Sequence, residues 1–192
     1  MKKINWAILI SGWGRSAVKT LELVEEGRLQ NHEIRVIFYE NENNGILEPA
    51  GELGIPCRRL SKTEFESHEA YYMELKKQAK ELEVDFLFLM GYKHIIREPL
   101  LSMFNNKIVN IHPSLLPSFR GKRAIQQAMD YGVKITGITT HLIDEEVDRG
   151  TILCQHPVPI SSGESFEEID LRFVAEGKKI IEQTFIEMEK YG

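Results

Sequence analysis

The sequence has little of what marks a secreted or membrane-spanning protein. It has only two cysteines in 192 residues, and they do not form a Cys-x-x-Cys pair. Cys57 and Cys154 lie in apolar segments far apart, and we expect both to be buried thiols in a reducing compartment. No apolar run approaches the roughly 20 residues of a membrane helix, and the first residues show no secretory signal. These absences predict a soluble cytoplasmic protein.

The chain also lacks an excess of positive charge. Lys and Arg number 24 against 29 Asp and Glu, which gives a formal net charge of −5. Such a balance provides no general attraction for nucleic acid or an anionic membrane, and we expect neither as a partner. There are no repeats, low-complexity tracts or linkers, so residues 1–192 are expected to form one domain, as a monomer or a homodimer.

Strand-like and helix-like segments alternate in the first half of the chain. Apolar runs predict strands at 4–10, 33–40, 55–60 and 85–90, and helical spacing predicts helices from about 17, at 46–53 and at 67–84. Further strands are expected at 107–112, 133–143 and 151–160, with helices at 122–131 and 165–190. The pattern predicts a single α/β domain with an open, mostly parallel Rossmann-like sheet, helices on both faces and antiparallel strands in the second half.

A glycine-containing loop follows the first expected strand and comprises Gly12, Trp13, Gly14, Arg15 and Ser16. A loop of this kind presents backbone N–H groups at a helix N-terminus, which suits a phosphate or a carboxylate. It also contains the first half of a dinucleotide-binding fingerprint, and Glu40 follows the second strand, where an acidic residue can hold a ribose. A nicotinamide-dependent oxidoreductase, an anion site and a purely structural turn all remain open at this point.

Two polar side chains stand at the end of the strand expected at 107–112. Asn110 and His112 share one face of this strand, and two prolines break the chain soon after it. Asp148 lies in the acidic turn 144–150. An amide, an imidazole and a carboxylate suffice for acyl transfer to an amine, because a base must accept the amine proton and donors must stabilise the oxyanion.

Three consecutive motifs resemble the signature of the folate-dependent formyltransferases. The motifs are Asn110-x-His112-Pro113-Ser114-Leu115-Leu116-Pro117, Gly137-x-Thr139-x-His141 and Val147-Asp148-x-Gly150-x-Ile152-x-x-Gln155. The length is similar to that of the single-domain glycinamide ribonucleotide transformylases. We expect no separate C-terminal domain of the kind found in methionyl-tRNA and most sugar formyltransferases.

The resemblance implies direct transfer of a formyl group from 10-formyltetrahydrofolate to a primary amine, with no metal. It favours phosphoribosylglycinamide, in de novo purine synthesis, as the acceptor, with an amino sugar nucleotide or a modified amino acid as the alternative. It also implies that Asn110 donates a hydrogen bond to the formyl oxygen and that His112 stabilises the oxyanion, most effectively as a cation. Asp148 is expected to raise the pKa of His112 and to help relay the amine proton. Thr139 and His141 are expected to support the acidic turn.

The same resemblance assigns the lining of two binding sites. The expected folate-binding residues are Tyr92, His94, Ile95, Ile96, Ile143, Asp144 and Val147. The acceptor is expected at residues 12–16 and at Glu176, although Arg15 replaces a serine of the usual phosphate loop and Gly177 replaces a usual histidine. A non-catalytic folate-binding module, which would retain the pocket without turnover, is the alternative outside enzymology.

Overall fold

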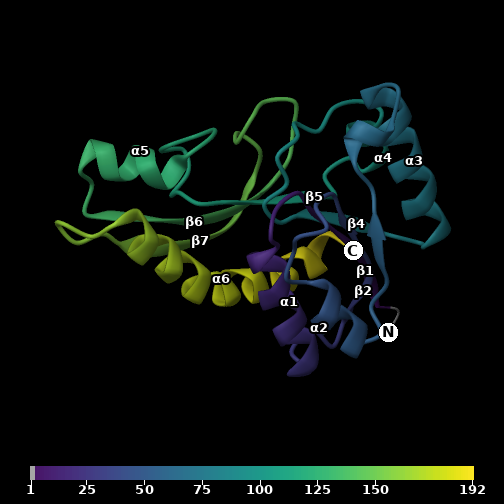
Figure 1. Ribbon diagram of the computed structural model, residues 1–192, viewed down its shortest axis with the longest axis horizontal. Helices are drawn as coiled ribbons and strands as arrows, with labels where there is room; N and C mark the ends of the chain where they lie inside the picture. The colour runs from purple at the N-terminus through teal and green to yellow at the C-terminus, as the bar shows by residue number, and fades with distance from the viewer. Residues whose placement is uncertain (1–2) are drawn as a thin grey trace.

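The computed structural model describes residues 3–192 of the chain. Its strands form one seven-stranded mixed sheet (Figure 1). The strands are β1 (Ile4–Ile10), β2 (His32–Tyr39), β3 (Cys57–Arg59), β4 (Phe86–Leu89), β5 (Ile108–His112), β6 (Ile135–Leu142) and β7 (Ile152–Pro159). The helices are α1 (Arg15–Glu25), α2 (Leu47–Glu52), α3 (His68–Glu81), α4 (Leu100–Met103), α5 (Ala124–Tyr131) and α6 (Phe166–Met188), with 3₁₀ turns η1 (Lys62–Glu64) and η2 (Glu189–Tyr191).

The strand order is β3-β2-β1-β4-β5-β6-β7, so the first strand of the chain lies inside the sheet. The strands β1 to β5 pair in parallel, whereas β6 pairs antiparallel with both β5 and β7. The chain leaves β1 toward β2 on one side and later returns to β4 on the other. The carboxyl ends of β1, β4 and β5 therefore border the crevice at which open α/β sheets bind their ligands. The predicted fold class is confirmed.

Two hydrophobic clusters cover the two faces of β1 because successive side chains point to opposite faces. Trp6, Ile8 and Ile10 pack with α1, α2 and α6, and Ala7 and Leu9 pack with α3 and α4. Figure 1 shows α1, α2 and α6 on one side of the sheet and α3 and α4 on the other. Both faces are covered, which explains why β1 is an apolar run rather than an alternating pattern.

The ends of several elements differ from the sequence-based expectation. The helix expected from 122 begins at Ala124, because Arg123 has a left-handed backbone conformation with φ of 57°. The helix α6 begins close to the expected position, after a capping box formed by Ser165 and Glu168, but the last residues of the expected helix form η2 instead of α-helix. The short elements η1 and α4 were not predicted. Each is too short to show a hydrophobic period.

Both cysteines are free and half-buried. Burial raises the pKa of the Cys57 thiol to about 11. In the described part of the chain, no helix is both long and apolar enough to cross a bilayer.

Candidate active site

Asn110 and His112 lie at the carboxyl end of β5, between a parallel and an antiparallel neighbour. In the sheet register, Asn110 is opposite Leu89 of β4 and His141 of β6, and His112 is opposite Thr139. The predicted strand therefore places both side chains at the crevice. The sheet register also places His141 and Thr139, two further residues of the formyltransferase-like motifs, beside them.

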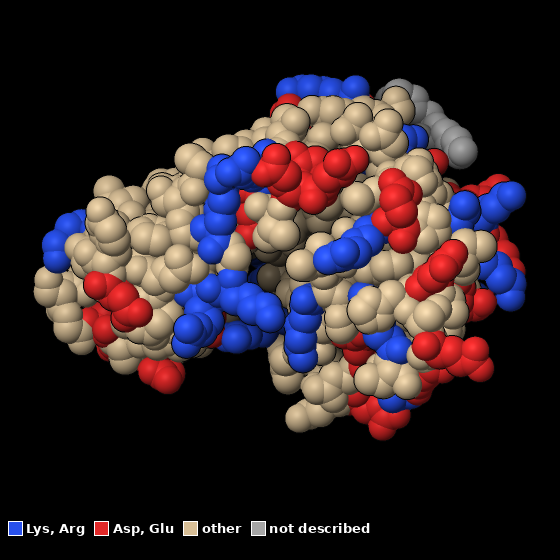
Figure 2. Space-filling model, turned by 90° about the horizontal axis from the view of Figure 1, so that it is seen from above, with Lys and Arg blue, Asp and Glu red and all other residues tan. Residues whose placement is uncertain are grey.

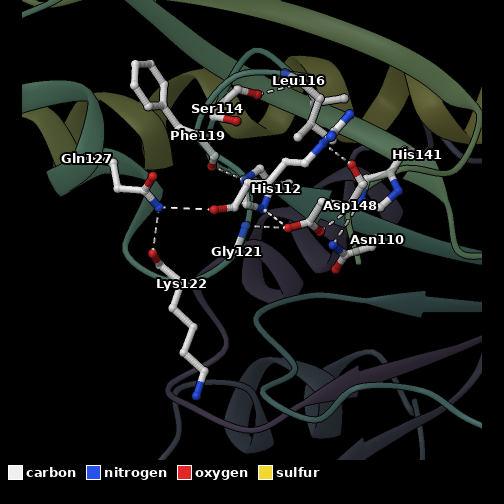
Figure 3. Close-up of polar contacts among 12 residues, drawn as sticks. Asn110, His112, Ser114, Leu116, Phe119, Gly121, Lys122, Gln127, His141 and Asp148 are labelled. Atoms are coloured by element: carbon white, nitrogen blue, oxygen red, sulfur yellow. Dashed lines mark hydrogen bonds and ion pairs between the residues drawn. The ribbon is translucent and has the colours of Figure 1, made fainter. Parts of the chain in front are cut away.

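Asp148 reaches the same point from the loop that follows β6 (Figure 3). Its Oδ2 atom accepts a hydrogen bond from the Gly121 N–H at 2.8 Å and lies 3.4 Å from Nδ1 of His112. Its Oδ1 atom lies 3.5 Å from Nε2 of His141. The side chains of His112 and Asp148 are only 6% and 9% exposed. The amide, the imidazole and the carboxylate thus converge in one nearly buried cluster.

Burial and polar contacts shift the pKa values of this cluster in opposite directions. Burial lowers the pKa of His112 below its ordinary value, and this effect outweighs the opposite effects of Phe119 and Asp148. Burial alone would raise the pKa of Asp148, but the contact with His141, the hydrogen bond from the Gly121 N–H and the proximity of His112 hold this pKa below its usual value. The site therefore contains a carboxylate beside a neutral imidazole at pH 7. Asp148 raises the pKa of His112, as expected, but burial outweighs this effect.

The backbone carbonyls around the cluster determine where the ring protons lie. Nε2 of His112 donates to the carbonyl of Phe119 at 2.9 Å, so the neutral ring directs the lone pair of Nδ1 toward Asp148. Nδ1 of His141 donates to its neighbouring carbonyl at 2.9 Å, and its Nε2 accepts from the Asn110 amide at 3.2 Å. An amide nitrogen has two hydrogens, so Asn110 keeps one for a further acceptor.

Thr139 organises the proline-broken loop that follows β5. Its hydroxyl donates to the Ser114 carbonyl at 2.6 Å and accepts from the Leu116 N–H and from the Gln155 side chain, each at 3.1 Å. The Gln155 amide also donates to the Leu116 carbonyl at 2.9 Å. Thr139 was expected to support the acidic turn, and that prediction was wrong, because its side chain lies next to the loop after β5.

Further hydrogen bonds hold Gly121, whose N–H donates to Asp148, in position. The side-chain amide of Gln127 donates to the carbonyls of Arg120 and Lys122, which flank Gly121 (Figure 3). Arg120 Nε in turn donates to the backbone carbonyl of Asp148 at 3.1 Å. These bonds hold the Gly121 N–H at the carboxylate.

The acidic turn takes its shape from two backbone constraints. Asp148 has a left-handed conformation with φ of 53°, which aspartate tolerates better than most residues. At Gly150, a Cβ atom would lie 1.8 Å from the Leu142 carbonyl oxygen, so only glycine fits this approach. The turn can therefore fold back and point Asp148 toward β5.

Asn110, His112 and Asp148, here called the triad, border a cavity of about 580 Å³. All the residues expected to bind folate line it, namely Tyr92, His94, Ile95, Ile96, Ile143, Asp144 and Val147. Lys93, Lys122 and Arg123 also line this cavity, as do the acidic residues 144–146. Figure 2 shows a face of the molecule with a hollow near its centre, where Lys and Arg side chains gather beside the hollow and Asp and Glu side chains lie above it.

A smaller cavity of about 310 Å³ lies beside it, at the carboxyl end of β1. The whole loop of Gly12, Trp13, Gly14, Arg15 and Ser16 lines this cavity, as expected. Arg15 forms an ion pair with Asp170 of α6.

Glu176 does not line the smaller cavity, so its predicted role in acceptor binding was wrong. It pairs with His156 at 2.9 Å and with Lys179 at 2.8 Å. The residues of α6 that do line this cavity are Asp170, Phe173, Val174 and Gly177. Their spacing of three and four residues is that of one helix face and could have been recognised in the sequence.

The two cavities share part of their lining, formed by Gly91, Ile111, Pro113 and Ile125. Ile111 lies between Asn110 and His112 on β5. The two cavities therefore meet beside Asn110 and His112.

Glu40 was considered as a residue that holds a ribose, but its side chain contacts a histidine in the structure. Its Oε1 atom lies 2.6 Å from Nε2 of His94, which lines the larger cavity. Among residues 3–192, no group of three His, Cys, Asp or Glu side chains is arranged to hold a metal ion.

The family model described as "Formyl transferase" matches residues 4–185. The chain is 34% identical over 171 residues to the trifunctional purine biosynthetic protein adenosine-3 of Bos taurus, covering 89% of this chain but only 17% of that protein. Phosphoribosylglycinamide formyltransferase from Bacillus halodurans has 34% identity and a TM-score of 0.88, with 94% of this chain and 93% of that chain covered. Glycinamide ribonucleotide transformylase 1 from Symbiobacterium toebii has 33% identity and a TM-score of 0.90, covering 95% and 86%. With its motifs, fold and full-length similarity in agreement, the chain belongs to the formyl transferase family.

Proposed function

We propose that this protein transfers the formyl group of 10-formyltetrahydrofolate to the primary amine of phosphoribosylglycinamide, as a single catalytic domain in the cytoplasm. The proposal rests on the family and on the names of solved structures that are similar to this chain. The observation that carries it is the position of Asn110, His112 and Asp148 beside the lining that two cavities share.

The larger cavity is the proposed site of the folate donor, which supplies the formyl group. Ile95, Ile96 and Val147 offer apolar surface to a flat ring system, and the backbone of the 143–148 turn offers polar groups beside it. Three cations, Lys93, Lys122 and Arg123, line the same cavity and suit an anionic tail.

The smaller cavity is the proposed site of the amine. The Gly12–Ser16 loop and the N-terminus of α1 suit a phosphate. An acceptor held there reaches the triad across Ile111 and Pro113, which line both cavities.

The side chains of the triad then have separate roles. The free hydrogen of the Asn110 amide bonds the formyl oxygen and stabilises the negative charge that develops on it. The neutral His112 and the charged Asp148 together accept the proton that the amine loses on attack. A proton on Nδ1 of His112 faces the carboxylate of Asp148, so the charged ring is stabilised where it forms. His141 orients the amide and the carboxylate.

Formyl transfer should be measured with 10-formyltetrahydrofolate and phosphoribosylglycinamide, following formylated product by mass spectrometry. The unmodified chain should form product, and Asn110→Ala should lower kcat by at least about a hundredfold, as loss of an oxyanion donor does. Asn105→Ala, a change in an exposed loop residue, is the control and should keep normal turnover. Absence of product with the unmodified chain would refute the proposed reaction.

A further inference from the structure

The smaller cavity differs in chemistry between its floor and its rim. Met90, Ile125, Ile138 and Phe173 line the cavity and are buried, so its deep surface is apolar. The charged residues that line it are more accessible to solvent, with the Arg15 side chain 49% and the Asp170 side chain 21% exposed. Polar side chains are therefore concentrated at the rim.

An apolar floor disfavours hydroxyl groups that are placed directly against it. A sugar hydroxyl placed against this surface loses its hydrogen bonds to water and finds no side-chain partner to replace them. A flat hydrocarbon ring gains from the same burial. The floor thus favours an acceptor with an apolar body.

Trp13 provides a stacking surface at the rim. The indole lies against Gly45, where a Cβ atom would come within 2.2 Å of the ring, and the Gly45 N–H donates to the Trp13 carbonyl at 2.9 Å. The side chain nevertheless remains 51% exposed and lines the cavity. One side of the indole is fixed by the backbone, and the exposed part can contact a ring in the cavity.

Gly177 adds room to the floor. It is buried within α6 and lines the cavity, yet a Cβ atom there would have no contact within 4 Å. A side chain at this position would project into the cavity. The glycine therefore leaves space that a ring can occupy.

We propose that the smaller cavity also accepts primary amines whose body is a flat ring and whose far end carries a carboxylate or phosphate. The ring lies between Trp13 and Phe173, and the anion meets Arg15 in place of Asp170. This inference rests on the proposed formyl transfer and names a further acceptor class for it. The amine nitrogen forms a bond to the formyl carbon, the bond between that carbon and N10 breaks, and one amine proton ends on N10. The products are the formamide and tetrahydrofolate, with no change in oxidation state.

Three amines separate the contributions of ring and charge. The first is 4-(aminomethyl)benzoate, which has an amine, a ring and a carboxylate; the second is 5-aminopentanoate, which lacks the ring; the third is phosphoribosylglycinamide. With 10-formyltetrahydrofolate and the full chain, kcat/KM for the ring amine should exceed that for 5-aminopentanoate at least tenfold. Trp13→Ala should remove about tenfold of this preference, and Tyr131→Ala, which alters an exposed aromatic residue outside both cavities, should remove none.

Gly177→Leu gives an independent test. Leucine favours helix more than glycine does, so the variant should fold at least as stably while its side chain occupies the floor. It should lower kcat/KM for the ring amine more than tenfold. Leu171→Ala, at an exposed position on the same helix, should leave that value unchanged.

Tryptophan fluorescence detects binding without turnover. The chain has two tryptophans, of which Trp6 is completely buried and Trp13 is half-exposed. Without the folate, 4-(aminomethyl)benzoate should quench the emission of the unmodified protein, and the quench should disappear in Trp13→Ala.

The outcomes separate this inference from the proposed function. Formylation of phosphoribosylglycinamide but not of the ring amine would overturn the inference and leave the proposed function intact. Formylation of the ring amine alone would support the inference and refute the proposed acceptor. Equal kcat/KM for the ring amine and 5-aminopentanoate, or a quench that persists in Trp13→Ala, would overturn the inference. Absence of product with every amine would overturn both.

Discussion

Nδ1 of His112 lies 3.4 Å from Oδ2 of Asp148, and no backbone group among residues 3–192 forms a hydrogen bond with that nitrogen. Because Nε2 of the same ring donates a hydrogen bond to the Phe119 carbonyl, a proton gained by His112 binds to Nδ1, which faces Asp148. The pair is therefore built to hold one additional proton. We therefore expect substitutions of His112 and of Asp148 to have different effects.

Replacing Asp148 by asparagine should lower turnover by several orders of magnitude, because the amide cannot stabilise a proton on His112. Asparagine tolerates the left-handed backbone at this position, so the protein should fold nearly normally. Turnover at saturating substrate and thermal unfolding measure the two effects. Asp130→Asn, an exposed change on α5, is the matched control. Turnover near normal in Asp148→Asn would exclude the carboxylate from the reaction.

The rate should depend on pH through the neutral form of His112. Its pKa lies below the ordinary value of 6.5, so kcat/KM should be constant above about pH 6.5 and should fall about tenfold per pH unit below the lowered pKa. His68→Asn, a change at an exposed histidine, should keep this profile. A rate that instead rises as pH falls from 7 to 6 would show that the cationic ring is the active form.

The stability of the fold should follow the same direction. His112 and His32 are both buried with lowered pKa values, so the unfolded chain binds more protons than the folded chain below about pH 6.5. The free energy of unfolding should therefore be greatest above that pH and should decrease on acidification. Urea titrations at pH 7.5 and 5.5 test this. Greater stability at pH 5.5 would contradict it.

Two threonines of β6 offer a matched pair. Thr139→Val removes a hydroxyl that makes three hydrogen bonds and should cost about 1–3 kcal/mol of unfolding free energy, with a loss of turnover as the loop shifts. Thr136 is equally buried, but its hydroxyl has no hydrogen-bond partner among residues 3–192, so Thr136→Val should be neutral or stabilising. Denaturant titration of both variants provides the comparison. Equal losses would mean that the Thr139 hydroxyl does not hold the loop.

Arg15 and Asp170 should affect a phosphorylated acceptor in opposite directions. Arg15→Ala should raise its KM about two- to fivefold, as expected for a half-exposed charge, whereas Asp170→Asn should lower it by releasing Arg15 and removing a negative charge. Arg28→Ala breaks an ion pair with Glu182 of similar exposure and should leave KM unchanged. An unchanged KM in Arg15→Ala would exclude this side chain from anion binding.

Gly150→Ala should disrupt the acidic turn. The added methyl group would collide with the Leu142 carbonyl, so the turn must shift and Asp148 must move away from His112. Turnover should fall by more than tenfold, with a loss of stability. Gly51→Ala in α2, where the added methyl group meets nothing, should be neutral or slightly stabilising. A fully active Gly150→Ala variant would show that the turn tolerates rearrangement.

The sequence predicted most of what depends on local pattern. The apolar run before Asn110 and His112, the turn glycines and the alternation of strands and helices were sufficient for the sheet and for the crevice. The contact between His112 and Asp148, which are 36 positions apart, followed only from the resemblance to the formyltransferases. Periodicity contains no information about which loops meet.

The two errors of assignment have a common physical origin. Thr139 and Glu176 were placed by their position in motifs, whereas their contacts depend on how β6 and α6 are rotated about their own axes. A rotation of about 100° per residue separates neighbouring helix positions, so Gly177 faces the cavity while Glu176 faces His156. Rotation is determined by tertiary packing and was not accessible from the motif alone.

The central position of β1 also has a consequence for how the chain folds. Trp6, near the start of the sequence, packs edge-on against Phe185 of α6, with ring centroids 4.8 Å apart. A growing chain that lacks α6 would leave the part of β1 around Trp6 exposed to water and to other chains. The smaller cavity, which α6 lines, is therefore complete only after nearly the whole sequence has been synthesised.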